Sequence, residues 1–162
     1  MHSRAAELIR ILGLRPHPEG GHYGEVFRSA VRVRPADRDG ERVALTTIYF
    51  LLAAGEWSRW HRVAADEAWH FYEGDALDLL WLDAGGGDLV RRVRLGPAAS
   101  GTRPVAVVPA GSWQAARPLG AYTLVGCTVA PGFEFADFTV LADRPEDAAR
   151  LRAGHPNLAE LI

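Results

Sequence analysis

Short runs of apolar or alternating apolar and polar residues, separated by glycine and proline, occupy the chain from Tyr23 to Val140. Runs with these breaks are typical of β-strands joined by turns. The predicted strands are 43–52, 57–63, 67–73, 76–82, 89–95, 105–108, 122–127 and 135–140. Short strands at regular spacing, with turn signals between them, predict an all-β sandwich or barrel.

A short helix is predicted at the N-terminus of the chain. Leu8, Ile9 and Leu12 recur at helical spacing. Ser3 precedes them as a candidate N-cap, and Gly13 stands where a C-terminal glycine would end the helix.

A second short helix is predicted near the C-terminus, after the last strand. Asp143 and Glu146 have capping-box spacing, Pro145 falls in the first turn, and the helix is expected to end near Arg152. Between two of the strands, the glycine-rich segment 84–88 predicts a hairpin loop. The pattern contains no linker and no repeat, so the whole of 1–162 is expected to form one domain with short helices at both ends.

Composition narrows the class of protein. The chain has 162 residues, of which 48% are hydrophobic and 23% charged, and its net charge is −2, so nucleic acid is not an expected partner. The longest mostly apolar stretch, 43–55, is too short to cross a bilayer, and no membrane association is expected. The one cysteine, Cys127, cannot form an internal disulfide, which favours a cytoplasmic location.

The richest candidate chemistry lies between 55 and 74. If 57–63 is one strand and 67–73 its hairpin partner, His61 and Glu67 face each other, with Arg59 on the same face as His61. A histidine beside a carboxylate in a partly desolvated barrel can act as a general base near neutral pH, with the carboxylate orienting the ring. The alternative is a buried His–Glu pair whose hydrogen bond serves only the structure.

The spacing of these residues resembles the first motif of the cupin superfamily, G-x5-H-x-H-x3-E-x6-G. Gly55, His61, Glu67 and Gly74 fall in place, whereas Val63 stands at the second histidine position. The resemblance implies a barrel with its functional residues in the interior, and it leaves one metal ligand of the motif missing.

The second cupin motif is present in a reduced form. Pro109 and Gly111 match it, and Gln114 stands where the third histidine belongs. His61 and Glu67 are therefore the two usual ligands that remain, and we expect no cofactor. A divalent metal held by His61, Glu67 and Gln114 is the alternative, since a glutamine oxygen is a weak third donor.

A closer resemblance is to cupin family 5, a domain of unknown function similar in fold to dTDP-sugar epimerases. The matching segments are 16–21, 23, 27–29, 48–52, 61–63, 66–67, 69–70, 108–116 and 124–138. The resemblance covers roughly 14–142 and implies a cupin-type double-stranded β-helix, or jelly-roll barrel, that forms a homodimer. It does not supply a settled reaction.

These observations predict a polar and aromatic pocket for a small polar molecule. His61 and Glu67 are the candidate catalytic residues. The candidate ligand-binding residues are Gln114, Tyr49, Tyr72, Trp69, Glu19 and Arg59.

Three function classes fit such a pocket. The first is a cofactor-independent isomerase or epimerase acting on a carbohydrate-like or other small polar substrate, with His61 as base and Tyr49, Tyr72 or Tyr23 as the second proton donor. The second is a non-catalytic small-molecule binding protein. The third is a metal-dependent cupin enzyme with an incomplete ligand set.

Overall fold

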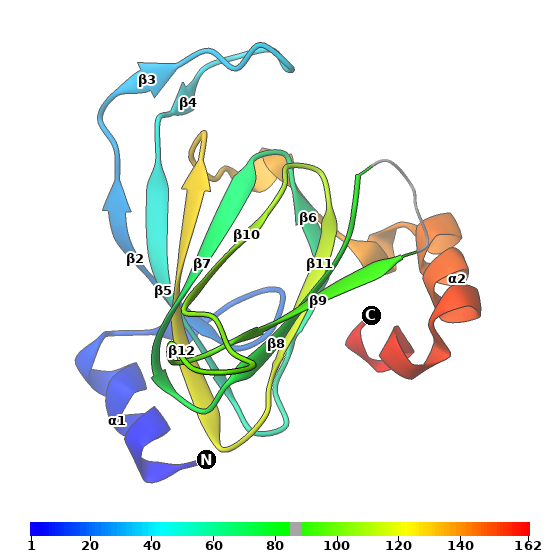
Figure 1. Cartoon of the computed structure of the whole chain (residues 1–162). Helices are drawn as coiled ribbons and strands as arrows, with labels where there is room; N and C mark the ends of the chain where they lie inside the picture. Colours follow the sequence, from blue (N-terminus) through cyan, green and yellow to red (C-terminus); the bar gives the residue numbers. More distant parts are fainter. Residues whose placement is uncertain (85–88) are drawn as a thin grey trace.

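The computed structural model describes residues 1–84 and 89–162, and antiparallel β-strands are the main secondary structure of this part of the chain (Figure 1). The helices are α1 (Ser3–Ile11) and α2 (Pro145–Gly154), with 3-10 helices η1 (Phe135–Asp137), η2 (Leu141–Asp143) and η3 (Pro156–Leu161). The strands are β1 (Arg15–Pro16), β2 (His22–Arg28), β3 (Arg32–Val33), β4 (Arg42–Val43), β5 (Thr46–Ala53), β6 (Ser58–Val63), β7 (Asp66–Gly74), β8 (Leu77–Leu82), β9 (Val90–Leu95), β10 (Val105–Val108), β11 (Trp113–Pro118), β12 (Tyr122–Ala130) and β13 (Phe138–Val140). The predicted all-β class with short helices at both ends is confirmed.

Two sheets form the body of the molecule. One has six strands in the order β1-β2-β5-β12-β7-β10, and the other has five in the order β13-β6-β11-β8-β9. A buried apolar cluster joins them, with Phe50 and Trp69 contributed by the first sheet and Leu79 and Ala116 by the second. The short strands β3 and β4 pair with each other in a separate two-stranded sheet.

Helices cover the outer face of each sheet, which explains why some strands are apolar on both sides. In β12, Val125 belongs to the inner cluster, whereas Leu124 packs against Ala5 and Leu8 of α1. On the other sheet, Trp60 packs in a cluster with residues of α2 and η3. None of the helices in the described part of the chain has the length and apolar character needed to cross a membrane.

The helix ends differ in detail from the predicted caps. The N-cap of α1 is His2, whose Nδ1 accepts the Arg4 amide at 3.2 Å, so Ser3 is not the cap. Gly13 does follow the helix with a positive φ of 62°, which glycine adopts without strain. At α2 the N-cap is Arg144 and no side chain caps the helix, so the predicted capping box with Asp143 is wrong.

The predicted hairpin of 57–63 with 67–73 is also wrong. β6 pairs with β11 and β13 in the five-stranded sheet, whereas β7 pairs with β12 and β10 in the six-stranded sheet. The chain therefore passes from one sheet to the other at 64–65, which places side chains of β6 opposite those of β7 across the interior. Of the predicted hairpin loop 84–88, all but Ala84 lies outside the described residues, although the flanking strands β8 and β9 do pair antiparallel.

Candidate active site

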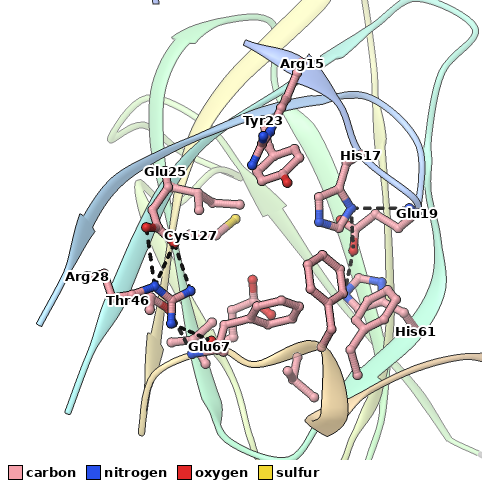
Figure 2. A pocket seen from close by; sticks show the side chains of 16 residues that line it. Arg15, His17, Glu19, Tyr23, Glu25, Arg28, Thr46, His61, Glu67 and Cys127 are labelled. Atoms are coloured by element: carbon pink, nitrogen blue, oxygen red, sulfur yellow. Dashed lines mark hydrogen bonds and ion pairs between the residues drawn. The ribbon is translucent and has the colours of Figure 1, made fainter. Parts of the chain in front are cut away.

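A cavity of about 150 Å³ lies between the two sheets. Its polar side chains include His17, Glu19, His61 and Glu67, and Figure 2 shows His17, Glu19 and His61 together on one side of the space. Its aromatic lining consists of Tyr23, Phe133, Phe135 and Phe138. Cavities of roughly 150 Å³ hold a molecule of about six heavy atoms, so the space suits a small metabolite.

Ser58 joins His61 on the cavity side of β6 because the strand contains a bulge. Gln114 of β11 faces His61 and Ala116 faces Ser58, so three steps along β6 match two along β11. The extra residue breaks the alternation of faces. Ser58 and His61 are both buried, with 3.4 Å between Ser58 Oγ and His61 Nδ1, while Arg59 is exposed. The expectation that Arg59 shares the His61 face and binds ligand in the interior is wrong for this reason.

The ring of His61 has a defined tautomer. Its Nδ1 lies 2.8 Å from the Arg59 carbonyl oxygen, which can only accept, so Nδ1 carries the proton and donates. Burial lowers the pKa of His61, and the nearby Glu67 and the Arg59 carbonyl oppose that effect. The neutral ring therefore presents the lone pair of Nε2.

The carboxyl group next to that lone pair belongs to Glu19, in the loop between β1 and β2. Its Oε1 accepts the Ser58 hydroxyl at 3.0 Å, and its Oε2 lies 3.4 Å from His61 Nε2 and 3.5 Å from His17 Nδ1. Burial raises the pKa of Glu19 to about 8. Burial and the facing His61 lower the pKa of His17 to about 4. Near pH 7 the group is thus a neutral carboxylic acid between two neutral imidazole rings.

Glu67 lies on the opposing sheet and lines the same cavity. Burial raises its pKa, and the neighbouring His61 acts against this. The sequence hypothesis took Glu67 as the carboxylate directly beside His61. The structure gives that position to Glu19 and places Glu67 across the cavity.

A chain of buried hydrogen bonds fixes the Glu67 side chain. Trp69 Nε1 donates to Gln114 Oε1 at 3.1 Å, and Gln114 Nε2 donates to Glu67 Oε2 at 2.6 Å. Because the indole can only donate, this chain sets the orientation of the glutamine amide. Gln114 is 1% exposed, and neither it nor Trp69 is among the described residues that line the cavity. The contact of these two side chains with a ligand stays a prediction, whereas the structure shows Gln114 bonded to Glu67 and Trp69 bonded to Gln114.

Gln114→Leu should lower the free energy of unfolding by about 2 to 3 kcal/mol, because it leaves a buried indole N–H and a buried carboxyl oxygen without their partner. Urea unfolding at pH 7 measures the loss. Adding Trp69→Phe removes the orphaned N–H, so Gln114→Leu should cost at least about 1 kcal/mol less in that background. An equal cost in both backgrounds would show that the bond between Trp69 and Gln114 has no energetic role.

Two of the three candidate tyrosines lie outside the cavity, and the third lines it. Tyr49 and Tyr72 form an edge-to-face pair with ring centres 6.0 Å apart, and Tyr72 is 50% exposed. The Tyr72 hydroxyl lies where a Cβ at Gly126 would be. Since Val125 and Cys127 point inward from β12, this pair is on the outer face, and its predicted contact with a ligand in the cavity is wrong. Tyr23 lines the cavity, with its ring centre 4.6 Å from that of His17.

The donor set expected of a metal-dependent cupin does not fit this interior. Val63 lines the cavity where the motif has a histidine, and both polar ends of Gln114 are occupied by Trp69 and Glu67. Within residues 1–84 and 89–162, no group of three or more His, Cys, Asp or Glu side chains could hold a metal ion.

Comparison with known proteins agrees with the motifs. The model of the family described as Cupin superfamily (DUF985) matches residues 6–141. The chain belongs to this cupin family. The resemblance expected from the sequence is thus confirmed. No curated protein matches the chain significantly.

Two solved structures resemble this cupin along nearly its whole length. A hypothetical protein from Leishmania major is 33% identical, with a TM-score of 0.83, and the match covers 98% of this chain and 96% of that one. A protein from Shewanella oneidensis is also 33% identical, with a TM-score of 0.80 and coverage of 97% and 93%.

More distant structures show the fold alone. The oxalate decarboxylase of Lactobacillus farciminis is 12% identical, with a TM-score of 0.57, and the match covers 92% of this cupin but 39% of that chain. The capsular polysaccharide assembling protein CapF from Staphylococcus aureus is 11% identical, with a TM-score of 0.56 and coverage of 78% and 31%. The double-stranded β-helix predicted from the sequence is confirmed.

Proposed function

We propose that this cupin catalyses proton transfer at a carbon next to a carbonyl group of a small polar molecule, as isomerases and epimerases do, without a cofactor. One observation carries the proposal: the Nε2 lone pair of a buried, neutral His61 meets the buried Glu19 carboxyl group at 3.4 Å inside a cavity. Acid and base groups with shifted pKa values in an enclosed space are typical of proton-transfer sites.

His61 is suited to be the base. The Arg59 carbonyl holds Nδ1–H at 2.8 Å, so the ring keeps its orientation while Nε2 accepts a proton from carbon. The imidazolium that forms lies 3.4 Å from Glu19 Oε2, and the neutral Glu19 carboxyl group keeps oxygen lone pairs that can accept a hydrogen bond from it.

Glu67 is suited to be the acid on the carbonyl oxygen. It lies across the cavity from His61, and its raised pKa favours the protonated form that can donate. In the first step the carbon proton passes to His61 Nε2, the C–H electron pair forms the C=C bond of an enol, and the carbonyl oxygen takes the proton of Glu67.

The reverse transfer completes the reaction. Return of the proton from His61 restores the original configuration at the carbon, whereas a proton from the Tyr23 hydroxyl, which Figure 2 shows directed into the cavity, inverts it. In both cases the enol O–H proton returns to Glu67 as the carbonyl group forms again. After inversion, the proton on His61 passes through solvent to the Tyr23 phenolate, which restores both groups. Of the three tyrosines considered from the sequence, Tyr23 is the one that supports this second role.

Solvent exchange tests the proposal directly. The protein in D2O should replace carbon-bound hydrogen next to the carbonyl in at least one member of a panel of short aldoses, ketoses and 2-keto acids, followed by proton NMR. His61→Gln should lower the exchange rate by about 100-fold or more, since general base catalysis contributes that much.

His70→Gln is the matched control, because this partly buried histidine of β7 is not among the described lining residues. It should retain the parent rate. Exchange no faster than in buffer across the whole panel, or an unchanged rate in His61→Gln, would contradict the proposal; binding without exchange would favour a non-catalytic binding protein.

A further inference from the structure

The mouth of the cavity carries two arginines with different surroundings. Arg28 donates to Glu25 at 2.9 Å, to Glu134 at 3.2 Å and to the Phe133 carbonyl at 3.3 Å. Arg15 is exposed, and its guanidinium carbon lies 5.0 Å from the centre of the Tyr23 ring. Within the described part of the chain, no carboxylate pairs with Arg15. The donors of Arg28 are used inside the protein, whereas those of Arg15 are available.

A series of side-chain contacts connects Arg15 to the acid–base groups. Its guanidinium lies over Tyr23, Tyr23 meets His17 with ring centres 4.6 Å apart, and His17 Nδ1 lies 3.5 Å from Glu19 Oε2. Figure 2 shows the guanidinium beside the Tyr23 ring, on the side of the cavity away from His61. A small molecule inside the cavity would therefore have one end near the guanidinium and the other near His61.

The charges of the lining favour an anion at the Arg15 end. Burial raises the pKa of Glu19, deeper in the cavity, to about 8, so this carboxyl group opposes an anion little near pH 7, and burial raises the pKa of Glu67 as well. Glu25 is neutralised by its ion pair with Arg28 at 2.9 Å. A planar guanidinium with free donors binds carboxylate and phosphate oxygens in a two-pronged geometry.

We propose that Arg15 binds the oxyanion group, a carboxylate or a phosphate, of the small molecule whose carbonyl end reaches His61. This rests on the proposed function and deepens it: the substrate is a small organic acid or phosphate ester. With the Arg15 donors spanning two oxygens of the anion, the ligand has one orientation in the cavity.

Three probes with one carbon skeleton test the anchor: glycerol, D-glycerate and glycerol 3-phosphate. Each is titrated into the protein while NMR follows the Arg15 Nε–Hε signal and the His61 ring signals. At least one anion should bind tenfold or more tightly than glycerol, and Arg15→Gln should weaken its binding tenfold or more, whereas the exposed Arg152→Gln on α2 should leave it unchanged.

The outcomes distinguish an organic acid from a phosphate ester as the ligand. Binding of D-glycerate alone assigns an organic acid, binding of glycerol 3-phosphate alone assigns a phosphate ester, and binding of both supports an oxyanion site of either kind. Binding of glycerol as tightly as the anions, no binding of any probe, or an unchanged affinity in Arg15→Gln would each overturn the anchor.

The same variants distinguish this inference from the proposed function. His61→Gln should keep the affinity for the anion within about twofold, because the anchor is at the other end of the ligand. Anion binding through Arg15 without proton exchange on the panel would support the anchor and contradict the proposed function. Exchange that is unaffected by Arg15→Gln in both rate and substrate affinity would support the function and contradict the anchor.

Discussion

Glu19→Gln should make the protein more stable than the parent at pH 9, by about 3 to 5 kcal/mol. Burial raises the pKa of Glu19 from 4.5 to about 8. Between these values the folded state binds more protons than the unfolded state, so the parent's free energy of unfolding falls as pH rises through that window and levels off above it. The glutamine variant lacks this group, and the difference between the two proteins should grow from near zero at pH 4.5.

The geometry suits a glutamine at this position. The amide oxygen can accept the Ser58 hydroxyl, as Oε1 of Glu19 does at 3.0 Å, and the NH2 group can donate toward the lone pairs of His61 Nε2 and His17 Nδ1. The substitution therefore reproduces the neutral acid and removes the cost of ionising it in a buried place.

Urea unfolding from pH 6.5 to 9 is the appropriate measurement. Below that range His17, whose pKa is lowered to about 4, adds the opposite slope, since the unfolded state binds its proton first and stability falls with acid. Glu146→Gln on exposed α2 is the control and should leave the slope unchanged. A Glu19→Gln protein less stable than the parent at pH 9 would show that the folded state holds a Glu19 carboxylate paired with a charged His61.

Several strands were predictable because their pattern is local, whereas β2 and β11 were not among the predicted ranges. Alternating apolar positions ended by glycine or proline indicate a strand wherever its partners lie, so β5, β7, β8 and β10 are found close to the predicted ranges. The family was predictable for a similar reason, since its motifs are short segments in fixed order. His61 and Glu67 were selected as candidates through such a motif, and both line the cavity.

The composition of the site was less predictable, because it depends on strand pairing. The bulge that turns Ser58 inward and Arg59 outward forms where β6 pairs with β11. The residue pattern of β6 alone therefore does not predict it. Glu19 is far from His61 in the chain, and the loop after β1 brings the two together. A histidine and a glutamate ahead of two glycines at 17–21 were visible as a motif, but its meaning as part of the acid–base group required the fold.

Gly20→Ala should lower the free energy of unfolding by about 3 to 5 kcal/mol at pH 6.5, because two costs add at one position. Gly20 has a φ of +112°, which side chains with a Cβ rarely adopt, and that Cβ would lie 2.2 Å from the Trp57 carbonyl oxygen. The neighbouring bond from Arg59 N to the Glu19 carbonyl, at 2.9 Å, ties the same loop to the start of β6. To relieve the overlap, the loop must move away from β6.

Gly55→Ala separates the cost of the positive φ from the cost of the overlap. Gly55 also has a positive φ, +83°, but a Cβ there meets nothing within 4 Å, so this change should cost about 1 to 2 kcal/mol. The excess in Gly20→Ala measures the overlap with Trp57. Movement of the loop also takes Glu19 out of its buried position, so Gly20→Ala should lose most of the fall in stability between pH 6.5 and 9 that the parent shows. A Gly20→Ala protein that costs no more than Gly55→Ala, or that keeps the full pH slope, would show that this turn does not hold Glu19 beside His61.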